Sequence, residues 1–291
     1  LDYSTTENAV QVSVSQLASN KKLISMILDS DGQKPNCVFC GEQLSVSVLK
    51  NITRKGITCD VSECPKCQVA MTHPFPSDKQ IADLYSTGNY RTDVGTRFNS
   101  IVEHLVYRAT VTKRRRIEKH AKVGKIIDIG CGRGLFLDIM RRGGWDAVGL
   151  ELNEETASYA QHMYGLKVYT GEDAEKSLKS ESFDVVHFCG VLEHSKKPGI
   201  LLSEAKRLLK SNGLLIVLLP DFRSFEFKLG KENWLHLDLP FHLFHFTEEG
   251  LSQILREKGF KIRVVKRFHL EYSPFGWLQT LLNISKVRFN L

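Results

Sequence analysis

The feature that most constrains this chain is a glycine-rich turn between an apolar strand and a helix, in the stretch "IIDIGCGRGLF" at 126–136. Residues 125–129 predict a buried strand, and Gly130, Gly132 and Gly134 follow it at alternate positions. Glycine lets the backbone turn tightly and lets a ligand approach without a Cβ in the way. The helix start beyond the turn offers unpaired N–H groups and a partial positive charge. The stretch therefore predicts a βα turn that binds a nucleotide-like ligand.

Strands and helices alternate along the chain from this turn onward. We predict strands at 125–130, 145–152, 166–171, 183–190, 213–220 and 260–270, and helices at 134–144, 153–165, 199–213 and 247–259. Several of these strands are nearly continuous apolar runs, which is typical of parallel strands covered by helices on both faces. The alternation predicts an α/β fold with a doubly wound parallel sheet.

The spacing within the turn indicates which ligand it binds. The pattern is G-x-G-x-G preceded by Asp128, whereas the dinucleotide fingerprint is G-x-G-x-x-G. An acidic residue beside the turn disfavours a pyrophosphate and suits a ligand that carries an ammonium group. Glu151, near the end of the second strand, is placed to accept hydrogen bonds from ribose hydroxyls. The chain has no G-x-x-x-x-G-K-[ST] motif, which excludes a P-loop. These features favour S-adenosylmethionine, an adenosyl amino acid without phosphate.

Four motifs occur in order: "IIDIGCGRGLFL", "GLELN", "FDVVHFCGVLEH" and "LLKSNGLLIVLLPD". This series resembles the class I S-adenosylmethionine-dependent methyltransferases over about residues 125–270, and it implies their Rossmann-like fold. The resemblance assigns the following positions to the cofactor: Asp128, Gly130, Cys131, Gly132, Gly134, Glu151, Leu152, Asp173, Ala174, Cys189, Gly190 and Tyr90. It places Glu151 on the ribose, Leu152 on the adenine and Gly190 beside the sulfonium. The family normally adds a seventh strand, for which "KVRFNL" is the only candidate here.

Five of the seven cysteines fall between positions 37 and 67. "CVFCG" and "CPKCQ" are two C-x-x-C knuckles separated by 23 residues, with a hairpin predicted between them. Paired knuckles are typical of a tetrahedral Zn²⁺ site, and four thiolates leave no open position for catalysis. We therefore predict structural zinc, which is favoured over a redox pair; the expected ligands are Cys37, Cys40, Cys64 and Cys67. Cys59 could replace Cys64, and His73 is a weaker substitute.

Methyl transfer to a hydroxyl requires removal of a proton, and histidine is the usual base near neutral pH. His194 follows the fourth strand of the sheet, and His236, His242 and His245 lie in "WLHLDLPFHLFHFT" after the fifth. Loops beyond the carboxyl ends of parallel strands face the ligand crevice. We therefore take His194 and His242 as the catalytic candidates. Packing among the neighbouring phenylalanines is the alternative for the loop histidines.

These features divide the 291-residue chain into a tail or docking helix (1–34), a zinc ribbon (35–76), a helical cap or linker (77–123) and an S-adenosylmethionine-binding domain (124–291). The formal net charge of +7 is a mild bias. We find no signal peptide and no run of the roughly 20 apolar residues that a membrane span needs. A cytoplasmic protein is expected, with peripheral membrane contact through the apolar segment 273–284 as an alternative.

A zinc ribbon ahead of this domain resembles a bacterial methyltransferase subgroup that modifies sugars, lipids and other small or glycan substrates. The expected function is therefore transfer of a methyl group to a small-molecule, sugar or lipid-linked acceptor, with a hydroxyl as the first choice. One rival is an rRNA or tRNA methyltransferase with a zinc RNA-recognition module. The chain lacks a basic stripe with interleaved aromatics and an N-P-P-[YF] motif after the fourth strand, which argues against nucleic acid. A non-catalytic zinc-ribbon protein is the second rival, and the intact glycine turn argues against it.

Overall fold

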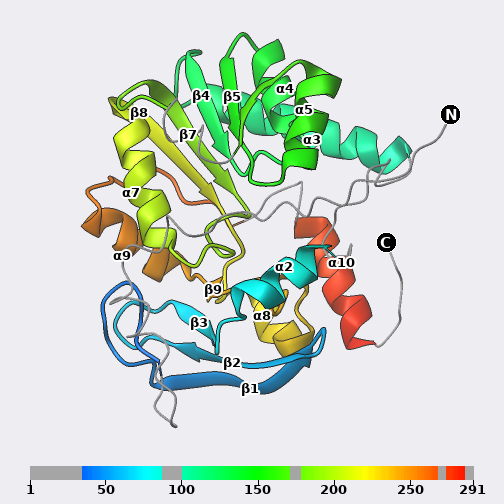
Figure 1. Cartoon of the computed structure of the whole chain (residues 1–291), viewed down its shortest axis with the longest axis vertical. Helices are drawn as coiled ribbons and strands as arrows, with labels where there is room; N and C mark the ends of the chain where they lie inside the picture. The colour runs from blue at the N-terminus through cyan, green and yellow to red at the C-terminus, as the bar shows by residue number, and fades with distance from the viewer. Residues whose placement is uncertain (1–34, 87–99, 171–177, 268–272, 286–291) are drawn as a thin grey trace, which may run out of the picture.

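The structure, a computed structural model, describes residues 35–86, 100–170, 178–267 and 273–285. Its larger sheet is entirely parallel and has the strand order β6-β5-β4-β7-β8 (Figure 1). The strands are β4 (Lys125–Ile129), β5 (Asp146–Leu150), β6 (Lys167–Tyr169), β7 (Phe183–Cys189) and β8 (Leu209–Leu218). The strand order reverses between β4 and β7: β5 and β6 extend the sheet on one side of β4, and β7 and β8 extend it on the other. A doubly wound sheet binds its ligand at such a switch point. The predicted fold class is confirmed.

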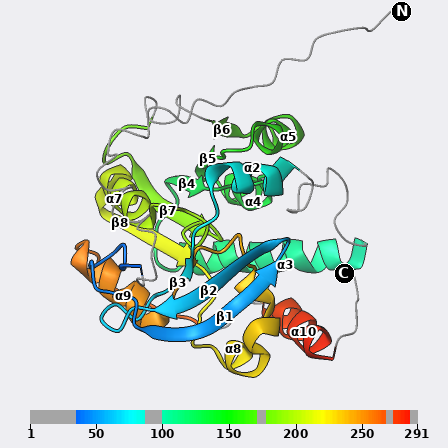
Figure 2. The same ribbon diagram turned by 60° about the horizontal axis from the view of Figure 1, so that its bottom comes forward.

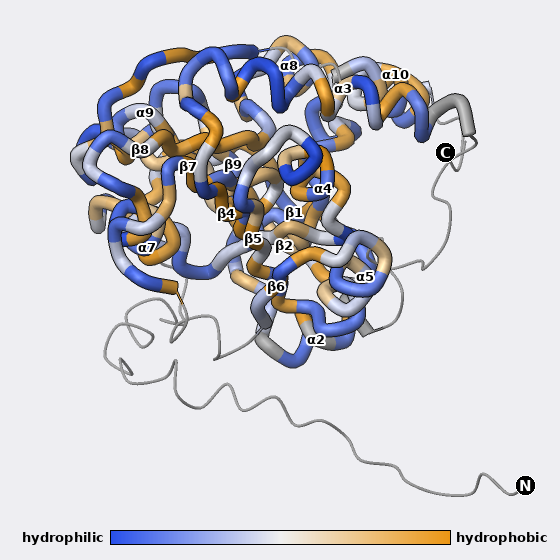
Figure 3. Tube along the Cα trace, turned by 90° about the horizontal axis from the view of Figure 1, so that it is seen from above, coloured by the Kyte–Doolittle hydropathy of each residue, from blue (hydrophilic) through white to orange (hydrophobic). Residues whose placement is uncertain are grey.

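Helices cover both faces of this sheet (Figures 1 and 2). One face carries α3 (Ser100–Glu118), α4 (Leu135–Arg142) and α5 (Glu154–Tyr164), and the other carries α7 (Pro198–Leu208) and α9 (Glu248–Glu257). Successive residues of a strand point to opposite faces of the sheet: Ile126 packs in the core under α3, α4 and α5, and Ile127 packs in the core under α7 and α9. Both side chains are fully buried. Figure 3 shows these apolar strands between the more polar helices. The continuous apolar runs follow from this two-sided burial.

Local capping signals set where the helices begin and end. The side chain of Asn153 accepts a hydrogen bond from the Thr156 N–H at 2.8 Å and starts α5, which ends at Gly165 in the left-handed region. Ser77 and Gln80 form a reciprocal capping box before α2 (Asp78–Ser86). These contacts satisfy amide groups that a helix end leaves unpaired.

A second sheet is antiparallel, has the order β1-β2-β3-β9 and lies in the lower part of Figure 1. Its strands are β1 (Val46–Arg54), β2 (Ile57–Glu63), β3 (Ala70–His73) and β9 (Phe244–His245). β1 and β2 form the hairpin predicted between the knuckles, and its turn at Lys55 and Gly56 has positive φ at both residues. β9 comes from the chain that follows β8. The cysteine-bearing lobe, residues 35–76, therefore completes its sheet with a strand from the methyltransferase half.

The end of the chain differs from the sequence prediction. Residues 260–267 form no strand, so the predicted sixth strand is wrong over its described part. Val264 and Val265 are 51% and 48% exposed, so the apolar pattern there has no core to cover. The chain instead adds α8 (Phe225–Gly230), the short helices η2 (Lys231–Asn233) and η3 (Leu235–Leu237), and α10 (Ser273–Ile284) beside the lobe.

The predicted helix at 199–213 ends early, because Leu209 already pairs with Phe183 as the first residue of β8. The candidate seventh strand at 286–291 lies outside the described residues.

Candidate functional site

The glycine turn connects the carboxyl end of β4 to α4. Gly130, Gly132 and Gly134 have φ of 75°, 53° and 83°, so all three adopt the left-handed region that other residues avoid. A Cβ on Gly134 would lie 2.6 Å from Leu166, whereas one on Gly132 would meet nothing within 4 Å. Gly134 is therefore required for packing against the α5 region. Gly132 faces open space where a ligand could approach the backbone.

Glu151 holds the turn from the end of β5. Its Oε2 accepts a hydrogen bond from the Gly132 N–H at 2.9 Å, and its Oε1 accepts one from the Asn153 N–H at 3.0 Å. The carboxylate is half-buried and occupies the amide that a phosphate would need in a dinucleotide site. The turn is thus negatively charged at its tip, which suits an adenosyl amino acid better than a pyrophosphate.

Asp128 has an internal partner that the sequence did not indicate. β4 and β7 place it directly opposite His187, and the His187 Nδ1–H donates to its carboxylate at 2.6 Å. Both side chains are buried, and the imidazole lies 4.3 Å from the ring of Phe136. The pair therefore joins the two strands that flank the switch point. The contact predicted between Asp128 and the cofactor stays a prediction.

The other predicted cofactor residues that the structure describes lie at or just after the carboxyl ends of β4, β5 and β7, at the same edge of the sheet. A Cβ on Gly130 would lie 2.4 Å from Val191, so the turn after β4 touches the turn after β7. Gly190 is exposed with φ of 67°, and Leu152 is 83% exposed at the end of β5. Cys131 is buried and Cys189 is half-buried. Tyr90, Asp173 and Ala174 lie outside the described residues.

The two candidate histidines come together beside a buried carboxyl group. The rings of His194 and His242 meet edge to face with centroids 4.5 Å apart. Glu193, which the sequence analysis gave no role, joins them: one ligating atom from each of the three residues lies within 4.8 Å of the other two. The Glu193 Oε1 lies 3.9 Å from the position a Cβ would take on Gly190. The cluster therefore borders the end of β7 where the sulfonium is expected. Adjacency to His194 was the only sequence signal for Glu193.

Backbone carbonyls fix the orientation of both imidazoles. The His194 Nδ1–H donates to the Phe241 carbonyl at 3.1 Å, and the His242 Nδ1–H donates to the His236 carbonyl at 2.8 Å. Burial, helped by the neighbouring imidazoles, holds the pKa of His242 well below its usual value. Burial raises the pKa of the Glu193 carboxyl to about 7. These groups therefore differ from ordinary surface histidines and glutamates, as groups in reactive sites commonly do.

The other loop histidines have structural contacts. The His245 Nε2–H donates to the Thr72 hydroxyl at 2.9 Å, and burial lowers the pKa of His245 to about 3. The Thr72 hydroxyl in turn donates to the His242 carbonyl at 2.8 Å. The ring of His236 lies 5.6 Å from that of Trp234. His245 thus links the loop to β3 of the cysteine-bearing lobe.

The four predicted zinc ligands meet at one point of this lobe. Their sulfur atoms lie within 4.8 Å of one another, and the Sγ atoms of Cys40 and Cys64 are 3.6 Å apart. The ligand positions are Cys37, Cys40, Cys64 and Cys67. Cys59 is elsewhere, with its thiol directed at the Ile52 carbonyl at 3.7 Å. His73 contacts the Ser62 hydroxyl. The structure therefore brings together the expected set, without either substitute.

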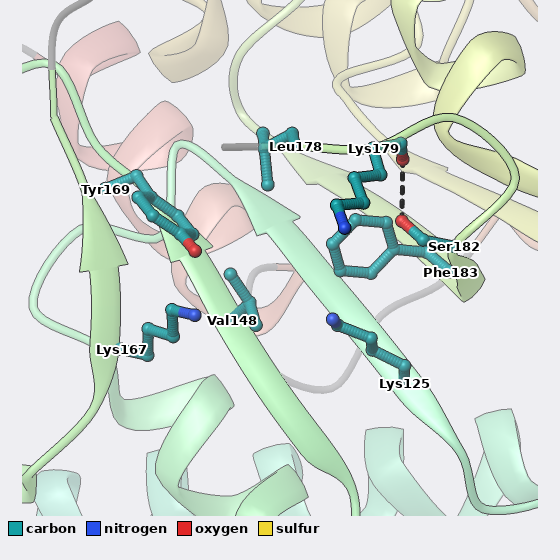
Figure 4. A pocket seen from close by; sticks show the side chains of 8 residues that line it. All are labelled: Lys125, Val148, Lys167, Tyr169, Leu178, Lys179, Ser182 and Phe183. Atoms are coloured by element: carbon teal, nitrogen blue, oxygen red, sulfur yellow. Dashed lines mark hydrogen bonds between the residues drawn. The ribbon is translucent and has the colours of Figure 1, made fainter. Parts of the chain in front are cut away.

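A separate hollow of about 260 Å³ lies on the parallel sheet, and Figure 4 shows its lining. It contains none of the predicted site residues. Lys125 and Lys167 direct their ammonium groups into it, but Lys125 also lies 3.8 Å from Asp146, and Lys167 lies over the ring of Tyr169. The charges of these two lysines are therefore engaged within the protein.

The apolar C-terminal helix is short. No helix within the described ranges has the length and apolar character needed to cross a bilayer. On α10, Leu278 and Leu281 are 50% and 49% exposed. The expectation of peripheral membrane contact through this segment stays a prediction.

Comparison with known proteins agrees with this geometry. Residues 102–265 match the model of the methyltransferase domain family. A ubiquinone biosynthesis O-methyltransferase of Cereibacter sphaeroides is 30% identical over 168 residues, covering 54% of this chain and 67% of the relative. One of Maricaulis maris is 35% identical over 152 residues, covering 48% and 59%. An uncharacterized protein of Methanocaldococcus jannaschii is 26% identical over 157 residues, covering 54% and 73%.

The matched region contains the whole parallel sheet, the glycine turn, Glu151 and the segment that ends in Glu193 and His194. The sheet order, the turn without a phosphate-binding pattern and the family match lead to one conclusion. The chain belongs to the methyltransferase domain family and is a class I, S-adenosylmethionine-dependent methyltransferase.

Proposed function

We propose that the enzyme methylates a hydroxyl group on a small-molecule, sugar or lipid-linked acceptor. The observation that carries this proposal is the pair of imidazoles at the end of β7, beside the position expected for the sulfonium. Two of the relatives are named as O-methyltransferases, which supports the same acceptor atom. The chain spans 67% and 59% of their lengths, so the whole-protein activity is part of the proposal.

The cofactor would lie across the switch point of the sheet. The exposed carboxyl edge of β5 offers Glu151 to the ribose and Leu152 to the adenine. Gly132 gives the amino acid part close access to the backbone, because nothing occupies the position of its missing Cβ. Gly190 leaves room at the end of β7 for the methyl-bearing sulfur. The residues present therefore fit an adenosyl amino acid.

The side chains of the chain would supply orientation and a proton acceptor. S-adenosylmethionine, when bound, supplies an electrophilic methyl group. The Nδ1–H of each imidazole is held by a carbonyl, so Nε2 of His194 or His242 is the atom that can accept the acceptor's hydroxyl proton. The oxygen–carbon bond forms as the sulfur–carbon bond breaks, and the products are a methyl ether, S-adenosylhomocysteine and a proton. Alignment within the crevice and general-base catalysis would both contribute.

We also propose that Cys37, Cys40, Cys64 and Cys67 bind one structural Zn²⁺. The convergence of four sulfurs from two knuckles supports this, since structural zinc is held by four such ligands. The ion would stabilise a lobe whose own core is small. It would also fix the end of β3, which pairs with β9 just after the histidine loop.

Calorimetry with S-adenosylmethionine tests the cofactor site. Glu151→Ala removes the contacts to Gly132 and the proposed ribose partner, so the affinity should fall at least about 10-fold, or about 1.4 kcal/mol. Glu154→Ala removes a neighbouring exposed carboxylate at the start of α5 and should leave the affinity unchanged. Equal affinity in wild type and Glu151→Ala would remove the ribose assignment.

Product analysis with hydroxylated acceptors tests the reaction. In His242→Gln, the maximal rate should fall roughly 10²- to 10⁴-fold with little change in cofactor affinity, because the proton acceptor site is lost. Methyl transfer to nitrogen or carbon, or steeply salt-dependent binding to bulk RNA, would contradict the proposed acceptor.

A further inference from the structure

The cluster of Glu193, His194 and His242 has a composition that general-base catalysis does not explain. Two imidazoles would suffice to accept a proton, yet a carboxyl group that is 2% exposed sits with them. The Oε2 atom of Glu193 is buried and has no hydrogen-bond partner among the residues the structure describes. A buried carboxyl oxygen without a partner loses the solvation it had in water, and such groups are normally paired or bind metal.

The arrangement matches what a metal ion requires. Two imidazole nitrogens and one carboxylate form the three-residue set found in catalytic zinc sites and in several other transition-metal sites, with positions left open. The Nδ1–H groups of both histidines donate to backbone carbonyls, the contact that commonly fixes the tautomer of a metal-binding imidazole. The residues also come from two separate segments, the turn after β7 and the loop before β9.

The backbone holds these two segments together independently of the side chains. The Glu193 carbonyl accepts hydrogen bonds from the Leu243 and Phe244 N–H groups at 2.8 and 3.1 Å. Thr72 then ties Leu243 and His242 to β3. Three possible ligands are thus brought within 4.8 Å of one another by a fixed framework.

We propose that Glu193, His194 and His242 together bind one divalent first-row transition-metal ion. This site is distinct from the four-cysteine site and contains no sulfur. The role of this ion in catalysis rests on the proposed function. An open coordination position of the ion would bind the acceptor's hydroxyl oxygen and lower the pKa of that hydroxyl group. In this form of the reaction the ion takes the place of the imidazole base, because the Nε2 atoms that could accept a proton would hold the ion. The hydroxyl proton leaves to solvent as the oxygen binds the ion, and the oxygen–carbon bond forms as the sulfur–carbon bond breaks. The preferred acceptor would be one whose oxygen can bind a metal, such as a phenol or a vicinal diol.

Titration of the full-length chain with Co²⁺, with zinc already in the cysteine site, tests the proposal by calorimetry and visible absorption. One Co²⁺ per chain should bind beyond the zinc, and the spectrum should lack the charge-transfer band of a thiolate ligand. Glu193→Gln and His242→Gln each remove one ligand and should weaken Co²⁺ binding at least about 10-fold. His162→Gln is the matched control, because His162 lies exposed on α5 with its Nδ1 at the Ser158 carbonyl.

The outcomes separate this proposal from the proposed function. Weaker Co²⁺ binding in Glu193→Gln, with unchanged circular dichroism and S-adenosylmethionine affinity, supports the metal site. If the wild-type protein, with zinc in the cysteine site, binds no Co²⁺ at millimolar Co²⁺ concentration, the metal site is overturned. The general-base role of the histidines then stays in place. Equal Co²⁺ affinity in wild type and both variants also overturns it. Failure of wild type to methylate any hydroxyl overturns the proposed function, while Co²⁺ binding still reports on the site.

Discussion

Alanine substitutions at the glycine turn can test protein stability and ligand binding separately. Gly132 and Gly134 of the turn, and Gly165 at the end of α5, differ in which atoms a Cβ would meet. Gly132, Gly134 and Gly165 all have positive φ, so an alanine at any of them costs about 1–2 kcal/mol for the left-handed backbone. Only Gly134 is also crowded: its Cβ would lie 2.6 Å from Leu166 and 2.9 Å from the Ala160 Cβ. Overpacking of this kind adds about 1–3 kcal/mol.

Three single alanine variants should therefore fall into different classes. Gly134→Ala should lose about 2–5 kcal/mol of unfolding free energy, and Gly165→Ala only the backbone share of about 1–2 kcal/mol. Gly132→Ala should match Gly165→Ala in stability, since neither Cβ meets an atom within 4 Å. Gly132→Ala should nevertheless bind S-adenosylmethionine at least about 10-fold more weakly, because its methyl group would enter the space proposed for the cofactor.

Urea unfolding followed by circular dichroism measures the stabilities, and calorimetry measures the affinities. Gly165→Ala is the matched control, because it is the same type of substitution away from the proposed cofactor position. If Gly134→Ala were no less stable than Gly165→Ala, the packing argument would be refuted. If Gly132→Ala bound the cofactor as tightly as Gly165→Ala, the cofactor would not lie over this turn.

Two further predictions concern the lobe and its surroundings. Burial raises the pKa of Glu226 in the folded protein above its unfolded value, so the stability that its protonated form contributes is lost as the pH rises. Glu226→Gln should therefore raise the melting temperature at pH 7.5 and give no gain at pH 4. An equal shift of the melting temperature at both pH values would contradict this. Cys64→Ser should lose the roughly one zinc ion per chain proposed for the lobe and should destabilise the protein, whereas Cys59→Ser should keep the zinc. Elemental analysis measures the zinc content. Retention of the zinc in Cys64→Ser would exclude Cys64 as a ligand.

The parts of the fold that could be predicted are those that depend on local pattern. The sheet follows from apolar runs separated by helices, and the cysteine cluster follows from two knuckles whose hairpin brings them together. The sixth strand was predicted from the same kind of pattern and is wrong over 260–267, because Val264 and Val265 remain about half exposed. An apolar run predicts a strand only where a neighbouring strand and a core are available to it.

The parts that could not be predicted depend on contacts between distant segments. Asp128 and His187 are 59 residues apart and meet only through the register of β4 against β7. Glu193 stands beside His194 in the sequence, but nothing local indicates that its carboxyl group is buried against His242. β9 has only two residues and carries no strand signal of its own.

β9 also links the cysteine-bearing lobe to the chain that follows the parallel sheet. The lobe pairs β3 with β9, and the Thr72 hydroxyl of β3 donates a hydrogen bond to the His242 carbonyl. The Thr72 N–H donates to the Leu243 carbonyl at 3.0 Å, while the Leu243 N–H donates to Glu193. A continuous chain of hydrogen bonds therefore runs from the lobe through the histidine loop to the turn after β7. The histidine loop is hydrogen-bonded to β3 on one side and to the turn after β7 on the other. We therefore expect an ion that holds the four sulfurs together to limit the movement of His242. The lobe thus supports the proposed acceptor site, and we expect a metal that stabilises the lobe to affect catalysis without touching the substrate.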